Sequence, residues 1–583
     1  MAEAAPILNR ARDLERAASP AGFDVLIIGA GINGAAVFWD LSLQGVRCLL
    51  VDREDIGSGA SSASTRMAHG GLRYLENGEV RLVAEATRER NRLLRNAPHY
   101  VRPLPVAIPA FAQAAGALAA ACRFFGRDRE LRLRGLQIVR LGLWVYDWLG
   151  RHERSLPRHR IENAAAARTA LPALHPAVRG VATYYDAAIS QAERLNLELV
   201  EDGIAACLDG AVLNHCAVEA VRDGAVTLVD QLAGRRLEVR PRLVVNATGA
   251  WIDGVNRSLG IARPLIGGTK GSHLVLDCPA LHAALAGRAF SFDDGRGRLC
   301  IVYPMGRAVL LGSTDIRIED PDTAVCDAAE TDYLLGAIRL IFPMVEVGTS
   351  HVRFRFCGVR PLPRAERPET GTISRDHAIE RDAPTTERPW PVLSLVGGKW
   401  TTFRAFAEQV TDMILGEFGA RRQTSTTERR IGGGADFPAD AAARERCVAD
   451  LGQFGCDAVR AAALLERYGT RAGRIARFCA EAADRPLAEA PDFTGREIAF
   501  LARHEMAETL GDLVFRRTTL ALDSRLTGPL VAELASRLAA ARGRDAAWAR
   551  NEADGLAHTL RERHGQEIGE PGAAMPALEG VAS

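Results

Sequence analysis

A glycine-rich turn near the start of the chain limits its fold more than any other feature. Residues 23–29 (FDVLIIG) are a short run of branched apolar residues, which predicts a buried parallel strand. Gly29, Gly31 and Gly34 then follow in the sequence GAGINGAA. In a dinucleotide-binding turn, the first glycine allows a tight bend, the second lets the backbone approach a pyrophosphate, and the third lets a helix pack on the strand.

The segments after this turn support the same interpretation. Residues 34–45 predict a helix whose N-terminus would hold the anion. Residues 46–52 predict a second strand, and it ends in Asp52, 18 residues after Gly34. An acid at this position binds ribose hydroxyls. We therefore expect a dinucleotide-binding unit at the start of an α/β fold.

The loop after Asp52 favours FAD over NAD. Residues 57–65 (GSGASSAST) are small and polar, and they can wrap a second phosphate and the flavin edge. The hydroxyl donors are Ser58, Ser61, Ser62, Ser64 and Thr65. A later apolar strand, residues 242–249, ends in NATG, which is similar to flavoproteins with two dinucleotide-binding motifs. Its Ala247, Thr248 and Gly249 are expected beside the first glycine turn.

The composition excludes several other classes. Hydrophobic residues make up 47% of the 583 residues and charged residues 25%, which is typical of a soluble globular protein with about three or four structural units. A net charge of +1 argues against a nucleic-acid-binding protein. Eleven cysteines without a C-x-x-C pair favour a reducing compartment over a disulfide framework, and we assign no metal ligands.

The sequence shows neither a signal peptide nor a membrane-spanning segment. The first 20 residues carry charges throughout and lack the apolar core of a signal peptide. No stretch of about 18 apolar residues occurs, so no spanning helix is expected.

Lysine is scarce, and its two positions are informative. Of the 73 basic residues, only Lys270 and Lys399 are lysines. A genome bias toward arginine explains the composition, but a lysine that remains can mark a place where a compact point charge is required. Chance survival is the alternative at either site.

The pattern along the chain changes several times. From residue 263 to 356 it predicts strands at 272–276, 299–303, 308–312 and 352–356 with a helix near 329–341, so we expect a separate antiparallel sheet. Residues 392–398 predict a strand and a glycine turn, and a helix follows from about 401. Residues 421–434 have the composition of a linker, and residues beyond 437 are almost wholly helical in pattern.

Nine motifs occur in an order that resembles one family. They are GAGINGAA (29–36), SSAST (61–65), HGGLRYLE (69–76), NATGAW (246–251), KGSH (270–273), GSTD (312–315), GVRPL (358–362), SRD (374–376) and GGKWTT (397–402). The chain from about 22 to 525 resembles the FAD-dependent, quinone-linked glycerol-3-phosphate dehydrogenases of aerobic bacteria. The resemblance implies an FAD-binding domain of the glutathione-reductase type, an antiparallel-sheet substrate cap and a C-terminal helical domain. The expected bounds are 22–262 for the first part of the FAD domain, with a helical excursion at 111–149, 263–356 for the cap, 357–420 for the return to the FAD domain and 435–565 for the helices.

The resemblance also implies the reaction and its site. Oxidation of sn-glycerol 3-phosphate to dihydroxyacetone phosphate moves a hydride from C2 to the flavin and needs cations for the phosphate. The expected substrate-binding residues are Arg360 and Arg375, with Arg73 and Lys399.

The remaining site residues are assigned within the same motifs. Lys399 is expected at the flavin edge, near the N-terminus of the following helix, where it can stabilise developing negative charge. His69 and His273 are the candidate general bases, with His273 preferred, and Tyr74 lies in the same site. Gly398, Thr401 and Thr402 complete the expected cofactor contacts.

Three departures and three rivals qualify the resemblance. Residues 110–130 resemble an insertion, position 52 is Asp where Glu is expected, and the run after GVRPL is divergent. An amino-acid or amine oxidase on the same fold would not need the set of arginines. A glycerol-phosphate oxidase that uses oxygen would carry an extra cap segment, and none is evident between 263 and 356. A flavoprotein that kept the fold without catalysis is disfavoured by the intact cations.

The electron acceptor and the location follow from the resemblance. Ubiquinone or menaquinone in the cytoplasmic membrane is the expected acceptor, so the protein would attach peripherally to its inner, cytoplasmic face. The candidate contact is 111–149, whose second half mixes apolar residues with Arg132, Arg134 and Arg140. Packing of this helix on the FAD domain is the alternative. A homodimer is a hypothesis that the sequence leaves open.

Overall fold

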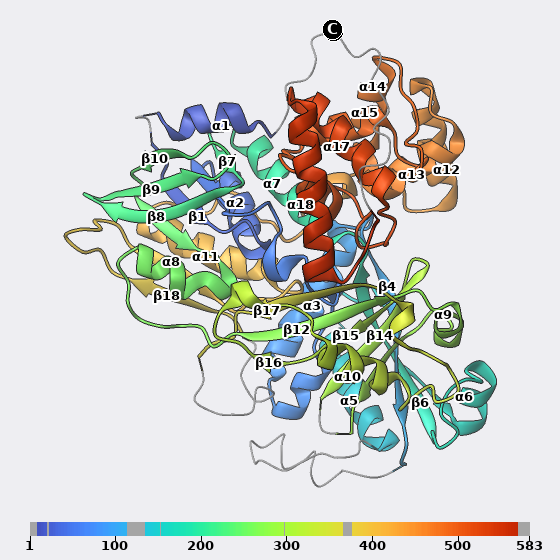
Figure 1. The fold of residues 1–583 in the computed structure, drawn as a ribbon. Coiled ribbons are helices and arrows are strands. Elements are labelled where there is room, and N and C mark those ends of the chain that lie inside the picture. The colour runs from blue at the N-terminus through green and yellow to red at the C-terminus, as the bar shows by residue number, and fades with distance from the viewer. Residues whose placement is uncertain are drawn as a thin grey trace.

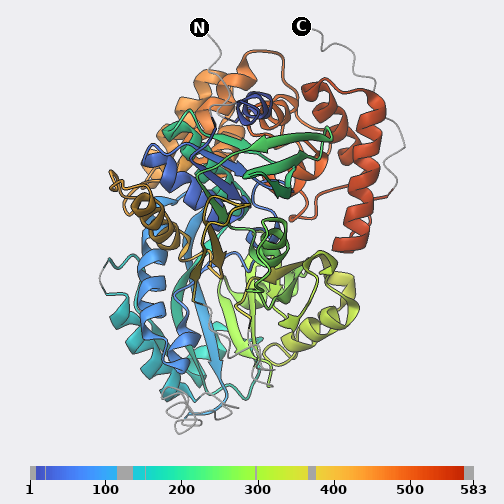
Figure 2. The same cartoon turned by 90° about the vertical axis from the view of Figure 1, so that its left-hand side faces the viewer.

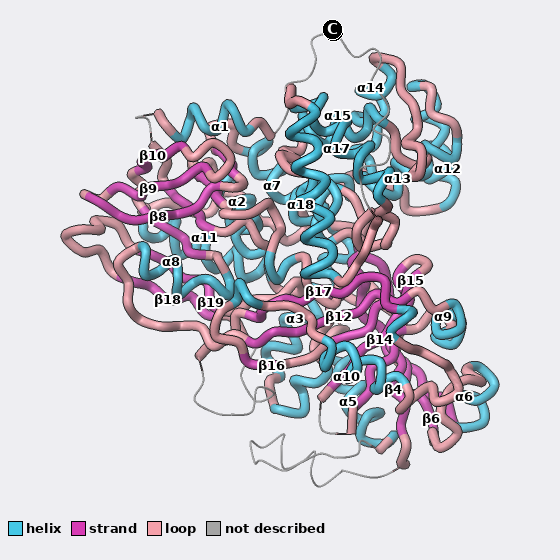
Figure 3. Tube along the Cα trace, in the orientation of Figure 1, coloured by secondary structure: helices cyan, strands magenta, loops and turns pink. Residues whose placement is uncertain are grey.

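The computed structural model describes residues 8–19, 22–113, 135–151, 153–295, 298–364 and 376–569. Three parts are visible in Figure 1: a sheet-and-helix domain at upper left, a helical domain at upper right, and a large sheet with covering helices below. Figure 2 shows the same parts from the side, and Figure 3 separates helices from strands by colour.

The dinucleotide-binding unit forms where it was expected. Strand β1 (Val25–Ile28) leads into helix α2 (Ile32–Leu43), and β2 (Cys48–Val51) follows. Both strands are wholly buried, as expected for apolar strands covered on both faces. The six-stranded sheet runs in the order β18 (Ala378–Asp382), β19 (Val392–Val396), β11 (Leu243–Asn246), β1, β2, β7 (Ala211–Leu213), and all pairs except β18–β19 are parallel.

Two layers cover this sheet. Helices α2, α7 (Ala192–Ala206) and α11 (Phe403–Glu417) form a core with one face. The other face packs on a three-stranded sheet of β8 (Cys216–Arg222), β9 (Ala225–Asp230) and β10 (Arg235–Val239). Because β11 and β19 come from distant parts of the chain, the domain closes only when residues 376–417 return to it.

The second sheet is larger than the sequence analysis predicted. The strands expected in its segment are present as β12 (Thr269–Leu276), β14 (Leu299–Met305), β15 (Ala308–Gly312) and β17 (Val352–Arg360), with helix α10 (Ala328–Ile338). They join β13 (Ala289–Asp293), β16 (Ile316–Arg317) and four strands from the first 190 residues: β3 (Met67–Ala68), β4 (Val101–Ala110), β5 (Arg160–Asn163) and β6 (Gly180–Ile189). The β13–β4 pair is parallel, so the sheet is mixed, and it extends beyond the segment 263–356.

Strand β4 was missing from the expectations for a physical reason. Its sequence, VRPLPVAIPA, places prolines at 103, 105 and 109, and proline cannot donate to a strand ladder. Alternate residues direct their backbone groups to the same neighbour, so all three missing N–H groups fall on one edge. The other edge pairs with β6 over ten residue pairs, whereas β13 pairs with only two residues of β4. This pattern depends on partners that are remote in sequence.

The remaining described helices surround these sheets. They are α1 (Arg10–Ala17), α3 (Val80–Asn96), α5 (Leu136–Leu149), α6 (Ala164–Ala170), α8 (Ile252–Ser258) and α9 (Pro279–Leu285). The second half of the expected helical segment 111–149 is confirmed as α5, whereas Phe111–Gln113 are not helical and residues 114–134 fall outside the described part. Within the described residues, no helix has both the length and the apolarity to cross a bilayer.

The C-terminal domain is helical, as expected. It contains α12 (Ala441–Leu451), α13 (Ala458–Tyr468), α14 (Ala472–Ala480), α15 (Gly495–His504), α16 (Leu510–Asp512), α17 (Gly528–Arg542) and α18 (Ala546–His564). Buried ion pairs attach it to the first domain: Arg517 bonds Asp55 through both carboxylate oxygens, and Arg194 bonds Glu505 in the same way. A buried charge needs a bonded partner, so these pairs define how the two domains dock.

Candidate active site

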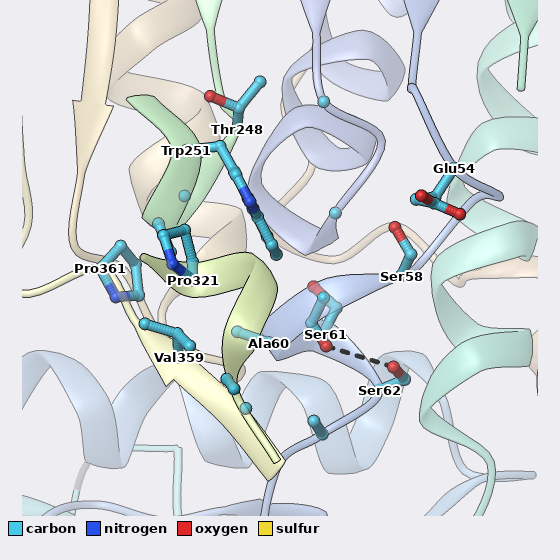
Figure 4. A pocket seen from close by; sticks show the side chains of 18 of the residues that line it. Glu54, Ser58, Ala60, Ser61, Ser62, Thr248, Trp251, Pro321, Val359 and Pro361 are labelled. Carbon is cyan, nitrogen blue, oxygen red and sulfur yellow. Dashed lines mark hydrogen bonds between the residues drawn. The ribbon is translucent and has the colours of Figure 1, made fainter. Parts of the chain in front are cut away.

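One large cavity lies where the three parts of the chain meet. Its volume is about 2240 Å³, and its walls come from the glycine turn, the loop after β2, the cap strands β12 and β17, and the C-terminal helices. Figure 4 shows part of it, with Ser58, Ser61 and Ser62 on one side and Thr248 and Trp251 on another.

The glycine turn provides the cradle that the sequence predicted. Gly29 has φ +100°, and a Cβ at this residue would lie 2.8 Å from the backbone of Ala247. A Cβ on Gly34 would lie 1.8 Å from the carbonyl oxygen of Gly29, so only glycine lets α2 approach the turn. Gly31 lines the cavity at the start of α2, and the Oδ1 atom of Asn33 is buried there without a donor among the described residues. These features fit a dinucleotide at the helix N-terminus.

Asp52 lies at the carboxyl end of β2, as expected for a ribose ligand. Its Oδ2 accepts a hydrogen bond from the Ala30 N–H at 2.7 Å, and its Oδ1 accepts one from the Glu54 N–H at 2.9 Å. Burial raises the pKa of Asp52 to about 6, although the two backbone donors oppose this shift. The carboxylate is therefore fixed in orientation and lines the cavity.

The serine-rich loop lines the cavity, but several of its hydroxyls already have protein partners. Ser61 Oγ accepts from the Ile32 N–H at 2.9 Å, which satisfies a donor at the N-terminus of α2. Ser62 Oγ donates to the Gly59 carbonyl oxygen, and Ser64 Oγ accepts from the Arg66 N–H, both at 3.2 Å. The loop thus shapes the cavity through its own folded conformation.

The NATG and GGKWTT motifs meet the glycine turn. Ala247, Thr248 and Gly249 line the cavity beside it, and Thr248 Oγ1 donates to Asn246 Oδ1 at 2.6 Å. Asn33 donates to the Gly397 carbonyl oxygen at 3.1 Å, which places Gly398 next to α2. The six-stranded sheet with its two covering layers, the glycine turn and the NATG motif together define a flavin-binding oxidoreductase with two dinucleotide-binding motifs.

A cation, an aromatic ring and a histidine lie together at one end of the cavity. The Nζ of Lys399 lies 4.0 Å from the centre of the Tyr74 ring, a cation–π contact. The rings of His69 and Tyr74 are 6.4 Å apart. The hydroxyl of Thr401 bonds both the N–H and the carbonyl oxygen of His69, at 3.0 and 3.1 Å, so the GGKWTT turn holds the HGG turn directly.

The double glycine before Tyr74 serves packing within the protein. A Cβ on Gly70 would lie 2.3 Å from the Tyr146 hydroxyl, and one on Gly71, where φ is +75°, would lie 2.3 Å from the Tyr74 ring. These residues are glycines because α5 and Tyr74 pack against them.

His273 lines the same cavity but is almost fully buried, with 2% of its surface exposed. Its Nε2 and Thr65 Oγ1 are 2.9 Å apart, and its ring stacks on Phe356 with a centroid separation of 4.9 Å. Burial, with smaller effects of Arg360 and Arg66, lowers the pKa of His273 to about 3. The imidazole is therefore neutral at any working pH.

Arg360 ends β17 and lines the cavity near His273. Its Nη1 donates to Asp315 Oδ1 at 3.1 Å, and its Nη2 donates to Ser313 Oγ at 2.8 Å and to the Thr314 carbonyl oxygen at 3.1 Å. A Cβ on Gly271 would lie 2.2 Å from Nη2, so that glycine makes room for the guanidinium. Asp315 balances part of its charge and holds the fork in place.

Most of the predicted site residues are brought together. The cavity is lined by Gly29, Gly31, Asp52, Ser61, Ser62, Ser64, Thr65, His69, Tyr74, Ala247, Thr248, Gly249, His273, Arg360, Gly398, Lys399 and Thr401. Gly34, Arg73 and Thr402 are outside its lining as formed by the described residues. Arg375 lies outside the described part of the chain.

The sequence analysis missed Arg66. This arginine lines the cavity, is 3% exposed and forms an ion pair with Glu193, while its Nε and Nη1 have no acceptor among the described residues. Its position directly after Thr65 in the serine-rich loop was the available signal. Trp251 was also missed, although it ends a motif that was recognised.

Comparisons with known proteins agree with this geometry. Residues 24–412 match the family described as FAD dependent oxidoreductase, and residues 424–552 match the C-terminal domain of alpha-glycerophosphate oxidase. A glycerol-3-phosphate dehydrogenase of Synechocystis is 32% identical over 526 residues, covering 86% of this chain and 89% of its own. One of Pseudomonas aeruginosa is 29% identical over 510 residues, covering 86% and 92%.

A solved structure shows the same fold. The glycerol-3-phosphate dehydrogenase of Bacillus halodurans, complexed with FAD, superposes with a TM-score of 0.72 at 20% identity and covers 98% of this chain and 100% of its own. The chain belongs to the glycerol-3-phosphate dehydrogenase family of FAD-dependent oxidoreductases, and its cofactor is FAD.

Proposed function

We propose that this enzyme oxidises sn-glycerol 3-phosphate to dihydroxyacetone phosphate and passes the electrons to a membrane quinone. The observation that carries the proposal is that Lys399, Arg360 and His273 line the same cavity as the dinucleotide-binding turn. FAD, when bound, would supply the hydride acceptor. The protein must then hold the phosphate, orient C2 and accept the proton of the C2 hydroxyl.

We assign binding of the substrate phosphate to the arginines. Arg360 presents a planar fork whose position is set by Asp315 and Ser313, so little conformational entropy is lost when an anion binds. We assign Arg375 and Arg73 to the same task, on the strength of the family motifs alone. A dianion needs more than one cation, because Asp315 already balances part of the charge of Arg360.

Lys399 is assigned to the developing negative charge. It lies at the turn that leads into α11, and its ammonium faces the Tyr74 ring. The half-buried position keeps the point charge effective, since electrostatic attraction strengthens as water is excluded.

His273 is the proposed general base, and Thr65 sets its orientation. The imidazole is neutral and can accept a proton, but its pKa near 3 makes it a weak base in the free enzyme. A dianionic substrate next to Arg360 offsets one cause of that low pKa and strengthens the base when substrate is bound. His69, half-buried beside Tyr74 and Lys399, is the second candidate.

Attachment to the inner face of the cytoplasmic membrane is proposed through α5. The inner face of this helix is buried through Leu136, Val139, Leu143 and Tyr146. Its outer face carries Leu141, Trp144 and Trp148, which are 65%, 61% and 51% exposed. Three large apolar side chains at positions i, i+3 and i+7, with exposed Arg140 beside them, are typical of an interfacial helix.

An anaerobic titration tests the reaction. Glycerol 3-phosphate should bleach the flavin absorbance, whereas glycerol and amino acids should leave it unchanged. Reoxidation is then followed with a short-chain quinone and, separately, with oxygen. The match of residues 424–552 to a domain named for an oxidase makes oxygen the second candidate acceptor. Failure of glycerol 3-phosphate to bleach the flavin would overturn the proposal, and faster reoxidation by oxygen would replace the quinone.

A further inference from the structure

Asp322 joins all three parts of the chain at the wall of the cavity. It lies in a short turn of the cap (Pro321–Thr323) and forms an ion pair with Arg53. Its Oδ1 accepts a hydrogen bond from Trp251 Nε1 at 2.9 Å, and its carbonyl oxygen accepts one from Arg563 of α18 at 3.4 Å. The first two partners belong to the FAD-binding domain and the third to the C-terminal domain. All four residues line the cavity.

Arg53 and Trp251 form a layer over the loop after β2. The Arg53 guanidinium lies 4.7 Å from the centre of the Trp251 ring. The ring is also 3.1 Å from the position that a Cβ on Gly59 would take. Figure 4 shows Trp251 between Thr248, Pro321 and Ala60, with its ring directed into the cavity.

The position of this layer identifies what it covers. Arg53 directly follows Asp52, the ribose acid, and Trp251 follows Thr248 and Gly249 beside the glycine turn. The space between the ribose acid and the glycine turn is where the adenosine and pyrophosphate of a dinucleotide lie in this class of fold.

We propose that Asp322 is a positioning residue for FAD. It holds Trp251 and Arg53 in the wall of the cofactor cavity, so the cofactor leaves only when the cap turn and α18 release this contact. The proposal concerns cofactor retention and is independent of the substrate. The cap would then have two tasks, since it would bind substrate and also retain the cofactor.

Loss of the Asp322 contacts should have a moderate effect on the rate of FAD release. Asp322 and Arg53 are both partly exposed, and an exposed ion pair contributes little by itself. The hydrogen bond to Trp251 adds a directional contact. Loss of both contacts should raise the rate of FAD release about 5- to 20-fold, and loss of the charge alone should raise it about 2- to 5-fold.

The test measures FAD release from the holoenzyme without substrate, by the rise in flavin fluorescence after dilution into an excess of a flavin-trapping apoprotein. Asp322→Ala removes both side-chain contacts, and Asp322→Asn keeps an acceptor for Trp251. Glu319→Gln is the matched control, since it neutralises an exposed acid of the neighbouring loop that also lines the cavity. Release should be fastest for Asp322→Ala, intermediate for Asp322→Asn, and unchanged for Glu319→Gln.

Two further measurements separate positioning from general stability. Added salt should speed FAD release from the wild type and from Glu319→Gln more than from Asp322→Asn, because salt screens the Arg53–Asp322 pair. The thermal midpoint of each apoprotein should match the wild type. Equal release rates in all four proteins would overturn the proposal, and so would a drop in apoprotein stability that accounts for the faster release.

Discussion

At the scale of single residues, neighbours decide what each charged group of the site can do. Arg360 and Lys399 are both cations of the same cavity, yet Arg360 is fixed by an acid and two oxygen acceptors, whereas Lys399 faces the Tyr74 ring. Burial lowers the pKa of His273, so its imidazole is neutral. The chemistry therefore follows from the contacts of each side chain as much as from its type.

Replacement of Arg360 by alanine should weaken substrate binding more than cofactor binding. A charge-assisted hydrogen bond contributes on the order of 1.5–3 kcal/mol, so KM for glycerol 3-phosphate should rise about 10- to 150-fold. The flavin content after purification should change little, because Arg360 is assigned to the phosphate of the substrate and not to the cofactor. Steady-state kinetics and the flavin-to-protein absorbance ratio measure both. A variant that loses FAD but has a normal KM after reconstitution would show that Arg360 is misassigned.

The two lysines provide a matched pair. Lys399→Arg should lower kcat on the order of tenfold, because a planar fork is bulkier over the Tyr74 ring and cannot replace a point charge. Lys270 instead contacts Glu330, Asp327 and the Val325 carbonyl oxygen at 2.7, 3.3 and 3.0 Å, which ties β12 to the start of α10. Lys270→Arg should therefore change thermal stability while kcat stays near the wild-type value. A wild-type kcat for Lys399→Arg would mean that the scarcity of lysine carries no information.

At the scale of elements, helix α5 has one buried face and one exposed apolar face. Its buried side packs on the cap sheet next to Tyr184 and supports the HGG turn through Tyr146, which accepts a hydrogen bond from the Gly70 N–H at 3.0 Å. Its other side presents Leu141, Trp144 and Trp148 to the surroundings, where Arg151 covers one face of Trp148. The helix thus has a packed face and an exposed apolar face.

Leu141→Glu combined with Trp144→Glu should release the protein from anionic vesicles. Two acids on the exposed face oppose both apolar insertion and attraction to the lipid charge. Sedimentation with vesicles at low salt measures binding, and reduction of the flavin by substrate should persist. Val459→Glu, which changes a residue of α13 that is 82% exposed, is the control and should still sediment. Wild-type protein that stays in the supernatant would place the membrane contact elsewhere.

At the scale of the whole molecule, the docking of the C-terminal domain depends on a buried charged cluster. His215 Nε2 bonds both carboxylate oxygens of Asp512, at 3.1 and 2.9 Å, and Arg517 bonds Asp55 nearby. Asp55, His215 and Asp512 are close enough to chelate a cation, but Arg517 already balances Asp55 and His215 already binds Asp512. The cluster is therefore best described as a domain contact.

This contact should weaken at high pH. Burial lowers the pKa of His215, but the bond to Asp512 outweighs it and raises the pKa to about 9. The unfolded value is about 6.5, so the stabilisation is complete below that pH and is lost as the pH rises through 9. The free energy of unfolding should fall by on the order of 2–3 kcal/mol between pH 7 and 10.

Denaturant unfolding across this pH range measures the effect. His215→Gln should begin with a lower free energy of unfolding and vary less with pH, so the difference between the two curves isolates this histidine from other titrating groups. Parallel curves for the two proteins would contradict the assignment.

The sequence by itself determined the local parts of this protein. The glycine turn, Asp52 and the strand before NATG depend on backbone conformation and on apolar runs of a few residues, and each forms as predicted. The helical C-terminal domain could also be predicted from the sequence, because amphipathic periodicity depends only on residues in neighbouring helical turns. The family motifs then located most of the predicted site residues in the cavity lining.

The tertiary structure alone decided how these parts join. Strand β4 carries three prolines and is stable only because β6 pairs with its other edge, so no local pattern indicates that the cap sheet includes residues 101–110. Arg66 became a site residue because Glu193, 127 positions away, holds it in a buried wall. Asp322 acquired its partners from two other domains. Pairing, burial and ion pairing act between groups that are close in space, and sequence distance gives no measure of that closeness.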